Sequence, residues 1–472
     1  MRRVDLAVLA TAAILVLALV LPATSSATDS GKRYVVMFSG DCIPRDAART
    51  VVAAGGKLVT VLPEVGIGIA VSDNPDFAAL LNRGRGVIAV GEERFMPFSE
   101  QEAPVDAEAD ALDPGVDTGY FAYQWDIRRV RADQAWSVST GSHDTVVAVI
   151  DTGVAWNHPD LAPNVAFHFC YSAVTGPCLD YPSLSYHGTH VAGTIAAAFG
   201  GGKAVGVGPN LGLASYNVVE LTADGLVAYD SAIWQAMLDA ARRGFKVINL
   251  SLGGYMVSTQ DGHQSEDDAR DAHGDKNDVV VWAAWNRVVK YVTRKGVTIV
   301  AAAGNNATDL KGPVAHIPSD LPAVIGVGGT AIRPDPVFPL DGSYDVLAEY
   351  SNYGAPVTLV APGGDTGPEG TPLPFPGTYY LIYSTYVRVS YACALTGTCP
   401  TRYAFTAGTS MAAPHVAGVA GLLIDREPWL NPHQVAAILK QTAEPLGDRQ
   451  LFGHGMVDAA MAVGKGPPRH HR

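Results

Sequence analysis

The sequence predicts an α/β protein: a three-layer domain with a mostly parallel sheet, preceded by a small α+β module. Three observations support this prediction. From about residue 122, short apolar runs rich in Val and Ile alternate with helical stretches that end at glycines. Such runs fit strands buried on both faces, as in a parallel sheet covered by helices, and glycine suits the C-terminal cap of a helix. An acidic segment near residue 100 divides the chain into two parts.

Residues 1–27 have the layout of a secretory signal peptide. Arg2 and Arg3 precede an apolar run, and small residues follow it up to Ala27. A membrane anchor is the alternative, because the run approaches the length that spans a bilayer. Pro22 and Ser25 favour cleavage, and no later segment is long and apolar enough to span. We therefore expect a secreted, extracellular protein with no membrane contact after signal cleavage.

Residues 33–97 have the pattern of a compact α+β module. Helices are expected at 45–55 and 75–84, and strands at 33–40, 58–72 and 87–95. Residues 98–121 are acidic, contain prolines and show no periodicity, so they are predicted to be a linker that contains the processing region.

Residues 122–465 carry the pattern of the α/β domain. Its predicted helices cover 190–199, 231–244 and 282–296. Its predicted buried strands cover 145–150, 246–252, 297–304, 323–329 and 357–363. In such sheets, functional residues collect at the carboxyl ends of the strands. An acidic stretch at 261–278, predicted to be a solvated loop, and an aromatic stretch at 368–405 interrupt the pattern.

Net charge and cysteine content limit the partners and the compartment. The formal net charge of -13 argues against a nucleic-acid partner, because phosphates require a basic surface. Four cysteines form two pairs that are close in sequence, Cys170 with Cys178 and Cys393 with Cys399. In an exported chain these favour two short-loop disulfides, although two other pairings stay open. Cys42 stands alone in the N-terminal module.

Three reactive side chains occur where a buried strand gives way to a loop or a helix. Asp151 ends the strand in "VAVIDTG", His187 opens the helix of "HGTHVAGT", and Ser410 opens the helix of "GTSMAAPHVAG". Acyl transfer needs these three types together, because an imidazole takes the serine proton and a buried carboxylate orients the imidazole. Gly408 and the small residues after Ser410 let the hydroxyl lie at the positive end of a closely packed helix. Thr409 is assigned as the helix cap.

Several of these signals have alternatives. "DTG" also occurs in aspartic proteases, but that chemistry needs two such carboxylates and no second one is positioned here. His190 and His187 are three residues apart on one helical face, so a metal pair is the alternative to a packed histidine. His158 and His415 are expected to be structural. An α/β-hydrolase esterase would require Gly-x-Ser-x-Gly and the order Ser, acid, His, which the chain lacks.

Several blocks of the sequence resemble, in order, those of the subtilases, the subtilisin-like serine endopeptidases. They are "VVAVIDTGVAWNHPDL", "HGTHVAGTIAA", "VINLSLGG", "VAAAGNN" and "GTSMAAPHVAG". The order Asp, His, Ser is also that of subtilisin. The resemblance runs from about Trp125 to "GHGMVDAAMAV" near the C-terminus. It implies a subtilisin-like fold and a serine endopeptidase that hydrolyses peptide bonds through an acyl-enzyme intermediate.

The resemblance also implies a role for each matching residue. Asp151 would be the orienting carboxylate, His187 the general base and acid, and Ser410 the nucleophile. Asn305, rather than Asn306, would donate its amide to the oxyanion together with the Ser410 backbone N–H. The alternative is a catalytically silent binding protein of the same fold, and the intact triad and Asn305 argue against it.

Further implications concern binding and processing. Substrate backbone would pair with an exposed strand edge that also lines the specificity pocket, formed by Ser251, Leu252, Gly253 and Gly254. Residues 33–97 would be an inhibitory propeptide of an autoprocessed zymogen, cut off between about Met96 and Tyr123, rather than a permanent binding domain. Cys42 would leave with it.

The expected partners and cofactors are few. Protein or peptide substrates and the chain's own propeptide are the expected partners, and the mature protein is expected to be a monomer. The chemistry itself should need no cofactor. Many family members bind a structural calcium ion, for which Asp160 matches one ligand, but Gly200 stands where an Asn ligand would fall.

Overall fold

The computed structural model describes residues 31–98, 105–106, 123–173, 178–182, 184–200, 203–257, 276–311, 314–334, 343–365 and 380–464. The expected signal peptide, most of the expected linker and the acidic stretch up to residue 275 therefore lie outside the described residues. Among the helices described, none has both the length and the apolar character needed to cross a bilayer.

An eight-stranded sheet forms the centre of the large domain. Its strands are β7 (Val146–Asp151), β8 (Val165–Cys170), β9 (Gly212–Asn217), β12 (Val247–Leu250), β14 (Thr298–Ala302), β16 (Val324–Pro334), β17 (Ser343–Leu347) and β18 (Val357–Pro362). The main order is β17-β16-β14-β12-β7-β9-β8, with β18 also paired to β16. Every pairing is parallel except that of β16 with β17. The mostly parallel sheet and its five predicted buried strands are confirmed.

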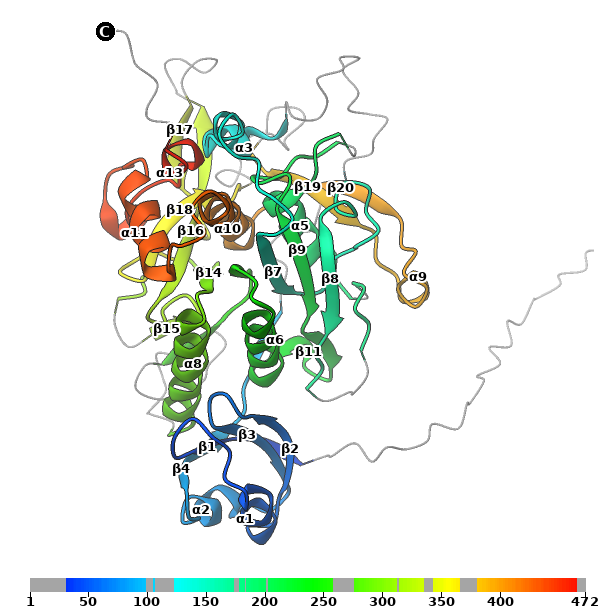
Figure 1. Ribbon diagram of the computed structural model, residues 1–472, viewed down its shortest axis with the longest axis vertical. Helices are drawn as coiled ribbons and strands as arrows, with labels where there is room; N and C mark the ends of the chain where they lie inside the picture. The colour runs from blue at the N-terminus through cyan, green and yellow to red at the C-terminus, as the bar shows by residue number, and fades with distance from the viewer. Residues whose placement is uncertain are drawn as a thin grey trace, which may run out of the picture.

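Helices cover both faces of this sheet, which gives three layers (Figure 1). On one face lie α5 (His187–Ala196), α10 (Thr409–Arg426) and α11 (Pro432–Thr442), and on the other lie α6 (Asp230–Arg243) and α8 (Lys276–Arg294). The central strand β7 shows why its sequence is apolar throughout. Val147 and Val149 join the core with α10, whereas Ala148 and Ile150 join the core with α6, since successive side chains of a strand point to opposite faces.

The N-terminal module is a four-stranded antiparallel sheet with two helices. It consists of β1 (Lys32–Phe38), α1 (Ala47–Ala53), β2 (Lys57–Leu62), β3 (Ile67–Ser72), α2 (Phe77–Leu81) and β4 (Val87–Glu92), with strand order β2-β3-β1-β4. Val36 and Phe38 pack with α1 and α2, and Val35 and Met37 join the core of the large domain. The module thus lies with one sheet face on α6 and α8 (Figure 1).

Three smaller sheets complete the strands. One contains β5 (Phe95–Pro97), β10 (Val219–Thr222) and β11 (Gly225–Tyr229); one contains β13 (Gly254–Val257) and β15 (Val314–Ile317); and one contains β6 (Val105–Asp106), β19 (Ile382–Val387) and β20 (Thr401–Thr406). Because β5 is the last strand of the module and pairs with β11 of the large domain, the two parts share a sheet.

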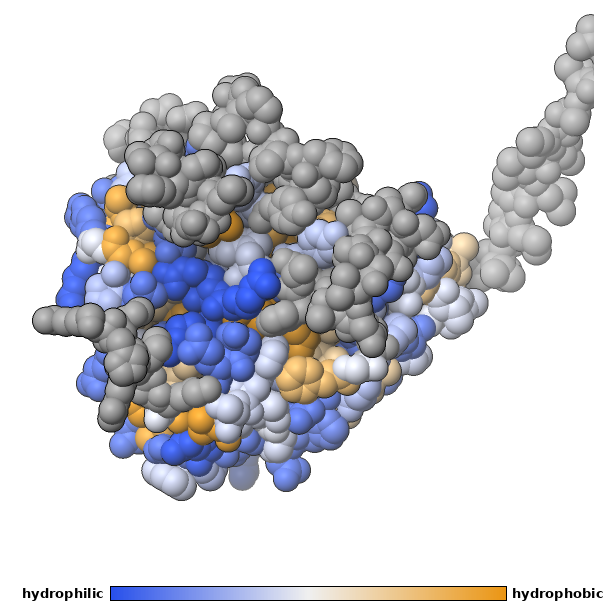
Figure 2. All heavy atoms as spheres, turned by 90° about the horizontal axis from the view of Figure 1, so that it is seen from above, coloured by the Kyte–Doolittle hydropathy of each residue, from blue (hydrophilic) through white to orange (hydrophobic). Residues whose placement is uncertain are grey.

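Short helices and ion pairs fasten the chain termini of the large domain. The short helices are α3 (Trp125–Arg129), α4 (Ala132–Ala135), α12 (Arg449–Phe452) and α13 (Ala459–Ala462). Arg129 pairs with Asp345 of β17 at 2.6 Å and with Glu444 at 2.8 Å. Figure 1 places α3 and β17 at the upper end of the molecule, and Figure 2 shows hydrophilic residues gathered near the middle of the face seen from there.

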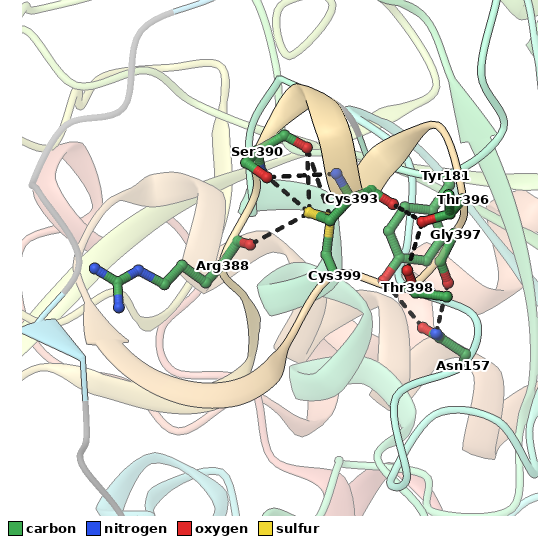
Figure 3. The surroundings of a disulfide bond; sticks show 9 residues. All are labelled: Asn157, Tyr181, Arg388, Ser390, Cys393, Thr396, Gly397, Thr398 and Cys399. Carbon is green, nitrogen blue, oxygen red and sulfur yellow. Dashed lines mark hydrogen bonds between the residues drawn. A yellow bond between two sulfur atoms is a disulfide. The ribbon is translucent and has the colours of Figure 1, made fainter. Parts of the chain in front are cut away.

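Both cysteine pairs have sulfur atoms at bonding distance, in the nearest-neighbour pairing that the sequence favours: Cys170 with Cys178 and Cys393 with Cys399. The second pair closes the tip of the β19–β20 hairpin, which carries α9 (Tyr391–Ala394) (Figure 3). Cys42 is exposed in the module and has no disulfide partner among the described cysteines.

Candidate active site

Three elements bring Asp151, His187 and Ser410 to one place. Asp151 is the last residue of β7, His187 the first of α5, and Ser410 the second of α10. His187 and Ser410 line one cavity of about 280 Å³. The arrangement follows the rule that sites form at the carboxyl ends of parallel strands.

Asp151 and His187 are joined by a buried hydrogen bond. His187 Nδ1 lies 2.8 Å from Asp151 Oδ1, which also accepts the backbone N–H of Thr152 at 2.7 Å. A carboxylate only accepts, so His187 carries its proton on Nδ1. Gly188 allows this approach, because a Cβ there would lie 2.5 Å from the carbonyl oxygen of Gly153. The neutral ring therefore presents the lone pair of Nε2.

Ser410 lies in a tight junction between the loop before α10 and the segment after β12. Its Oγ donates to the Ser251 carbonyl at 3.2 Å, and Ser251 Oγ donates to the Ser410 carbonyl at 2.8 Å. Gly408, which precedes the helix, has a φ of 148°, a conformation that favours glycine. These contacts hold the hydroxyl at the positive N-terminus of α10, as the sequence predicts.

The assignment of Thr409 as helix cap is wrong. Gly408 is the N-cap residue, and Thr409 instead contacts Asn305. The Oδ1 atom of Asn305 accepts from Thr409 N at 2.8 Å and from Thr409 Oγ1 at 2.7 Å. Because both bonds hold Oδ1, the Asn305 amide nitrogen is left to face the cavity that Asn305 lines with Ser410. Asn306 is engaged elsewhere, since Tyr255 Oη donates to its Oδ1 at 2.9 Å.

The residues predicted to bind substrate lie at the cavity, and their pairing with a substrate strand stays a prediction. Ser251, Leu252 and Gly253 link β12 to β13, whose first residue is Gly254, and all four line the cavity. β13 pairs with β15 along one edge, and its first residue, Gly254, lies beside β5, since a Cβ there would be 3.3 Å from Met96 Cγ.

β5 pairs with β11, a strand that was not predicted from the sequence. Ala228 of β11 is paired with Met96 in antiparallel register, and Phe98 N donates to the Leu226 carbonyl at 2.7 Å. The Phe98 ring packs edge-on against the His187 imidazole, with 4.9 Å between ring centroids. The end of the module therefore lies in the cleft and reaches the histidine.

Comparison with known proteins agrees with this geometry. The model of the subtilase family, Peptidase_S8, matches residues 142–455. A thermophilic serine proteinase of Bacillus sp. (strain AK1) is 33% identical over 349 residues, which cover 74% of this chain and 68% of the relative. Subtilisin Savinase of Lederbergia lenta is 31% identical over 72% of this chain and 98% of its own length. The chain belongs to the subtilase family. It is a subtilisin-like serine endopeptidase.

Solved structures support the same fold for this subtilase. The epidermin leader peptide processing protease of Staphylococcus aureus has a TM-score of 0.69 and 21% identity, and covers 93% of this chain and 99% of its own. Fervidolysin from Fervidobacterium pennivorans has a TM-score of 0.66 and 23% identity, and the match covers 93% of the subtilase and 62% of fervidolysin.

Asp160 is buried, and its two carboxylate oxygens differ in their hydrogen bonds. Its Oδ2 accepts from the backbone N–H groups of Lys203 at 3.1 Å and Ala204 at 3.0 Å. Oδ1 has no hydrogen-bond partner among the described residues, so it is the oxygen of Asp160 that could be a calcium ligand. In the described part of the subtilase, no three His, Cys, Asp or Glu side chains are grouped so as to hold a metal. A calcium requirement stays a prediction that other measurements must test.

The remaining histidines near α5 and α10 have structural partners. His190 Nε2 lies 3.1 Å from the Ile382 carbonyl and 3.2 Å from that of Ala404, and burial lowers its pKa to about 3. His415 contacts the Met411 carbonyl at 2.8 Å and Asp126 Oδ2 at 2.9 Å. These contacts favour packing roles over the metal pair considered for His190.

Proposed function

We propose that Asp151, His187 and Ser410 are the catalytic triad of this subtilase. The observation that carries the proposal is the buried hydrogen bond of His187 Nδ1 to Asp151 Oδ1, 2.8 Å long, at the cavity that Ser410 also lines. The bond fixes the tautomer in which Nε2 accepts the serine proton, and the carboxylate stabilises the imidazolium that forms.

The reaction follows from these positions. Rotation about the Cα–Cβ bond of Ser410 takes Oγ from the Ser251 carbonyl towards His187, which removes its proton as Oγ attacks the substrate carbonyl carbon. His187 then returns the proton to the departing amine, and an acyl-enzyme remains on Ser410. A water molecule, deprotonated by His187, then attacks the acyl carbon; the bond to Ser410 Oγ breaks, the acid product leaves, and His187 returns the proton to Oγ. The steps use only this chain's side chains and water.

Asn305 and the Ser410 backbone N–H are proposed to stabilise the oxyanion. Thr409 supports this role, because its two hydrogen bonds to Asn305 Oδ1, at 2.7 and 2.8 Å, turn the amide nitrogen towards the cavity. Donors fixed before the reaction stabilise charge at no cost in reorganisation.

We further propose that the N-terminal module is an inhibitory propeptide. Its last strand lies in the cleft through the pairing of β5 with β11. Buried charged side chains of the module hold it there: Glu93 accepts the N–H of Ser231 at the start of α6 at 2.9 Å, and Arg33, which is paired with Glu93, donates to the Ala173 carbonyl at 2.8 Å. A chain segment in this position excludes other substrates from His187.

The same strand indicates where the chain is cut. The residues on either side of β5 are also bonded to this part of the large domain, with Asp230 N donating to the Arg94 carbonyl and Phe98 N to the Leu226 carbonyl. The Phe98 ring packs against the His187 ring. We therefore assign the next residue, Ser99, as the one whose carbonyl Ser410 attacks. Edman sequencing of the secreted protein should then find a mature chain that begins at Glu100. A mature chain that begins at any other residue contradicts the assignment of Ser99, and a start within residues 33–90 also contradicts processing after the last strand of the module.

Export before processing is proposed from the pattern of residues 1–27 and from two cysteine pairs at disulfide distance. Disulfides persist in oxidising compartments, so they suit a secreted enzyme.

The triad is tested by labelling the secreted protein with a fluorophosphonate, followed by peptide mapping, with Ser410→Ala as the control. An adduct on Ser410 that is lost in the control supports the proposal. A protein that has lost its module but takes no label contradicts it and favours the binding-protein alternative.

A further inference from the structure

One histidine in the cleft has no part in the proposed chemistry. His316 belongs to β15, where it pairs with Tyr255 of β13. It lines the cavity together with Ser410 and Asn305, and only 4% of its surface is exposed. Tyr255 packs edge-on against its ring, with centroids 5.1 Å apart.

The tip of this imidazole fills the space between two backbone segments. A Cβ built on Gly253 would lie 2.3 Å from His316 Cε1, and a Cβ built on Gly304 would lie 2.8 Å from His316 Nε2. Gly253 belongs to the segment after β12, and Gly304 directly precedes Asn305. The ring thus closes the slot between the two walls beside the nucleophile.

The hydrogen bonds of the His316 ring determine which of its two nitrogens carries the proton. Ser319 Oγ donates to the His316 carbonyl at 2.8 Å and lies 3.2 Å from Asp320 Oδ1, so its proton is used away from the ring. It therefore accepts from His316 Nδ1, 3.0 Å away. Burial lowers the pKa of His316 to about 4, so the ring is neutral at pH 7. Nε2, at the slot, carries a lone pair that accepts a hydrogen bond.

We propose that His316 closes the pocket for the substrate residue whose carbonyl is attacked, and that it selects small side chains there, serine and alanine first. This inference rests on the proposed function. Large aromatic and aliphatic side chains would clash with the imidazole before they were fully inside the pocket. A serine hydroxyl can donate a hydrogen bond to Nε2. An aspartate carboxylate only accepts hydrogen bonds, so it would be repelled by the Nε2 lone pair.

The chain's own sequence agrees with this selection. The residue that follows Phe98 is Ser99, a small side chain with a hydroxyl group. The enzyme would thus process itself at a residue that its pocket accepts.

The test is a cleavage profile of the mature enzyme on a proteome-derived peptide library, with the residue before each cut read by mass spectrometry. Cuts after Ser and Ala should exceed those after Phe, Tyr and Leu at least about tenfold, the scale of discrimination by pocket size. Cuts after Ser should likewise exceed those after Asp. A profile dominated by large apolar residues overturns the proposal. No cutting at all refutes the proposed function, and this inference with it.

Two variants separate size from polarity. His316→Gly opens the slot, so cuts after Phe and Tyr should rise at least about tenfold relative to Ser. Ser319→Ala keeps the ring but frees its tautomer, so the preference for Ser over Asp should weaken while Phe stays excluded. His433→Ala, at an exposed position on α11, is the control and should leave the profile unchanged. If His316→Gly does not fold, the wild-type and Ser319→Ala profiles decide; a folded His316→Gly with the wild-type profile contradicts the proposal.

Discussion

The N-terminal module and the β19–β20 hairpin both contact the part of the molecule that carries His187, but they are held there differently. The module reaches it through the Phe98 ring. The hairpin packs along α5, where Ser384 Oγ donates to the His190 carbonyl at 2.9 Å and Thr385 Oγ1 to the Thr189 carbonyl at 2.7 Å. The hairpin thus contacts α5 through neutral hydrogen bonds.

The two interfaces also differ in what they bury. Hairpin residues Tyr383 and Phe405 belong to the main hydrophobic core of the large domain. The module adds apolar residues of its own, but it also buries charges, among them Glu93, whose side chain has no exposed surface. Neutral core contacts form together with the fold, whereas buried charges stabilise only while each has its partner. The comparison favours a permanent hairpin and a module that can be released.

The largest effect should come from preventing the cut that frees the module. Asp151→Asn leaves His187 with the wrong tautomer, which in a comparable triad lowers kcat by about 10⁴-fold. The secreted variant should therefore keep the module covalently attached, as seen by its mass on a denaturing gel. Asp144→Asn, at an exposed position before β7, is the matched control and should mature normally. Normal maturation of purified Asp151→Asn would exclude self-processing.

Weakening the charged interface should speed release of the module after the cut. Arg94 pairs with Asp278 at 3.1 Å, with side chains that are 18% and 3% exposed. Arg94→Ala leaves Asp278 buried without this partner, so the rate at which activity appears should rise at least about 30-fold. Lys32→Ala is the control, because the Lys32–Glu92 pair is 67% and 44% exposed and should change the rate less than about threefold. Equal rates for both variants would argue that apolar packing alone holds the module.

Release of the module should also depend on pH through Asp230. Burial, with smaller contributions from Glu93 of the module and Asp278 of α8, raises the pKa of Asp230 to about 7, against the lowering effects of Arg94 and a hydrogen bond from Trp285. A raised carboxyl pKa means that the covered state binds the proton more tightly than a solvated Asp230. The stabilisation that Asp230 gives to the bound module is therefore complete below pH 3.8 and is lost as pH rises towards 7.

The cleaved module should consequently dissociate about tenfold faster at pH 7.5 than at pH 5, measured as the rate at which activity appears after a pH jump. Asp230→Asn should remove most of this difference. Faster release at pH 5 than at pH 7.5 would contradict the sign and assign the dependence to other groups.

Much of the fold could be predicted from the sequence because its central strands are buried on both faces. β7, β12 and β14 therefore appear as continuous apolar runs. β8 alternates between more and less exposed residues at the edge of the sheet, and β11 was hidden within a segment of mixed character. Such strands are defined by their pairing with distant partners, and pairing leaves no local pattern.

The same limit applies to the site. Asp151, His187 and Ser410 could be proposed from the sequence because they lie at the ends of predicted strands and helices and match the subtilase blocks. The role of Thr409 was missed because its contact with Asn305 joins positions 104 residues apart. Nothing in the segment around His316 indicates that its ring would reach between Gly253 and Gly304.

The smallest effect should come from the disulfide at the hairpin tip. Cys393 and Cys399 close a loop of sequence separation 6, and the tip is also held by Asn157, which donates from Nδ2 to the Gly397 carbonyl at 2.8 Å (Figure 3). Replacing both cysteines with serine should lower the free energy of unfolding by about 2 kcal/mol, as expected for so short a loop. The change in kcat/KM should stay below about threefold, because the hairpin contacts to α5 lie in the core. Thermal unfolding and peptide hydrolysis of the mature variant measure both quantities. A large loss of activity without loss of stability would show that the tip, and not only the base of the hairpin, positions His187.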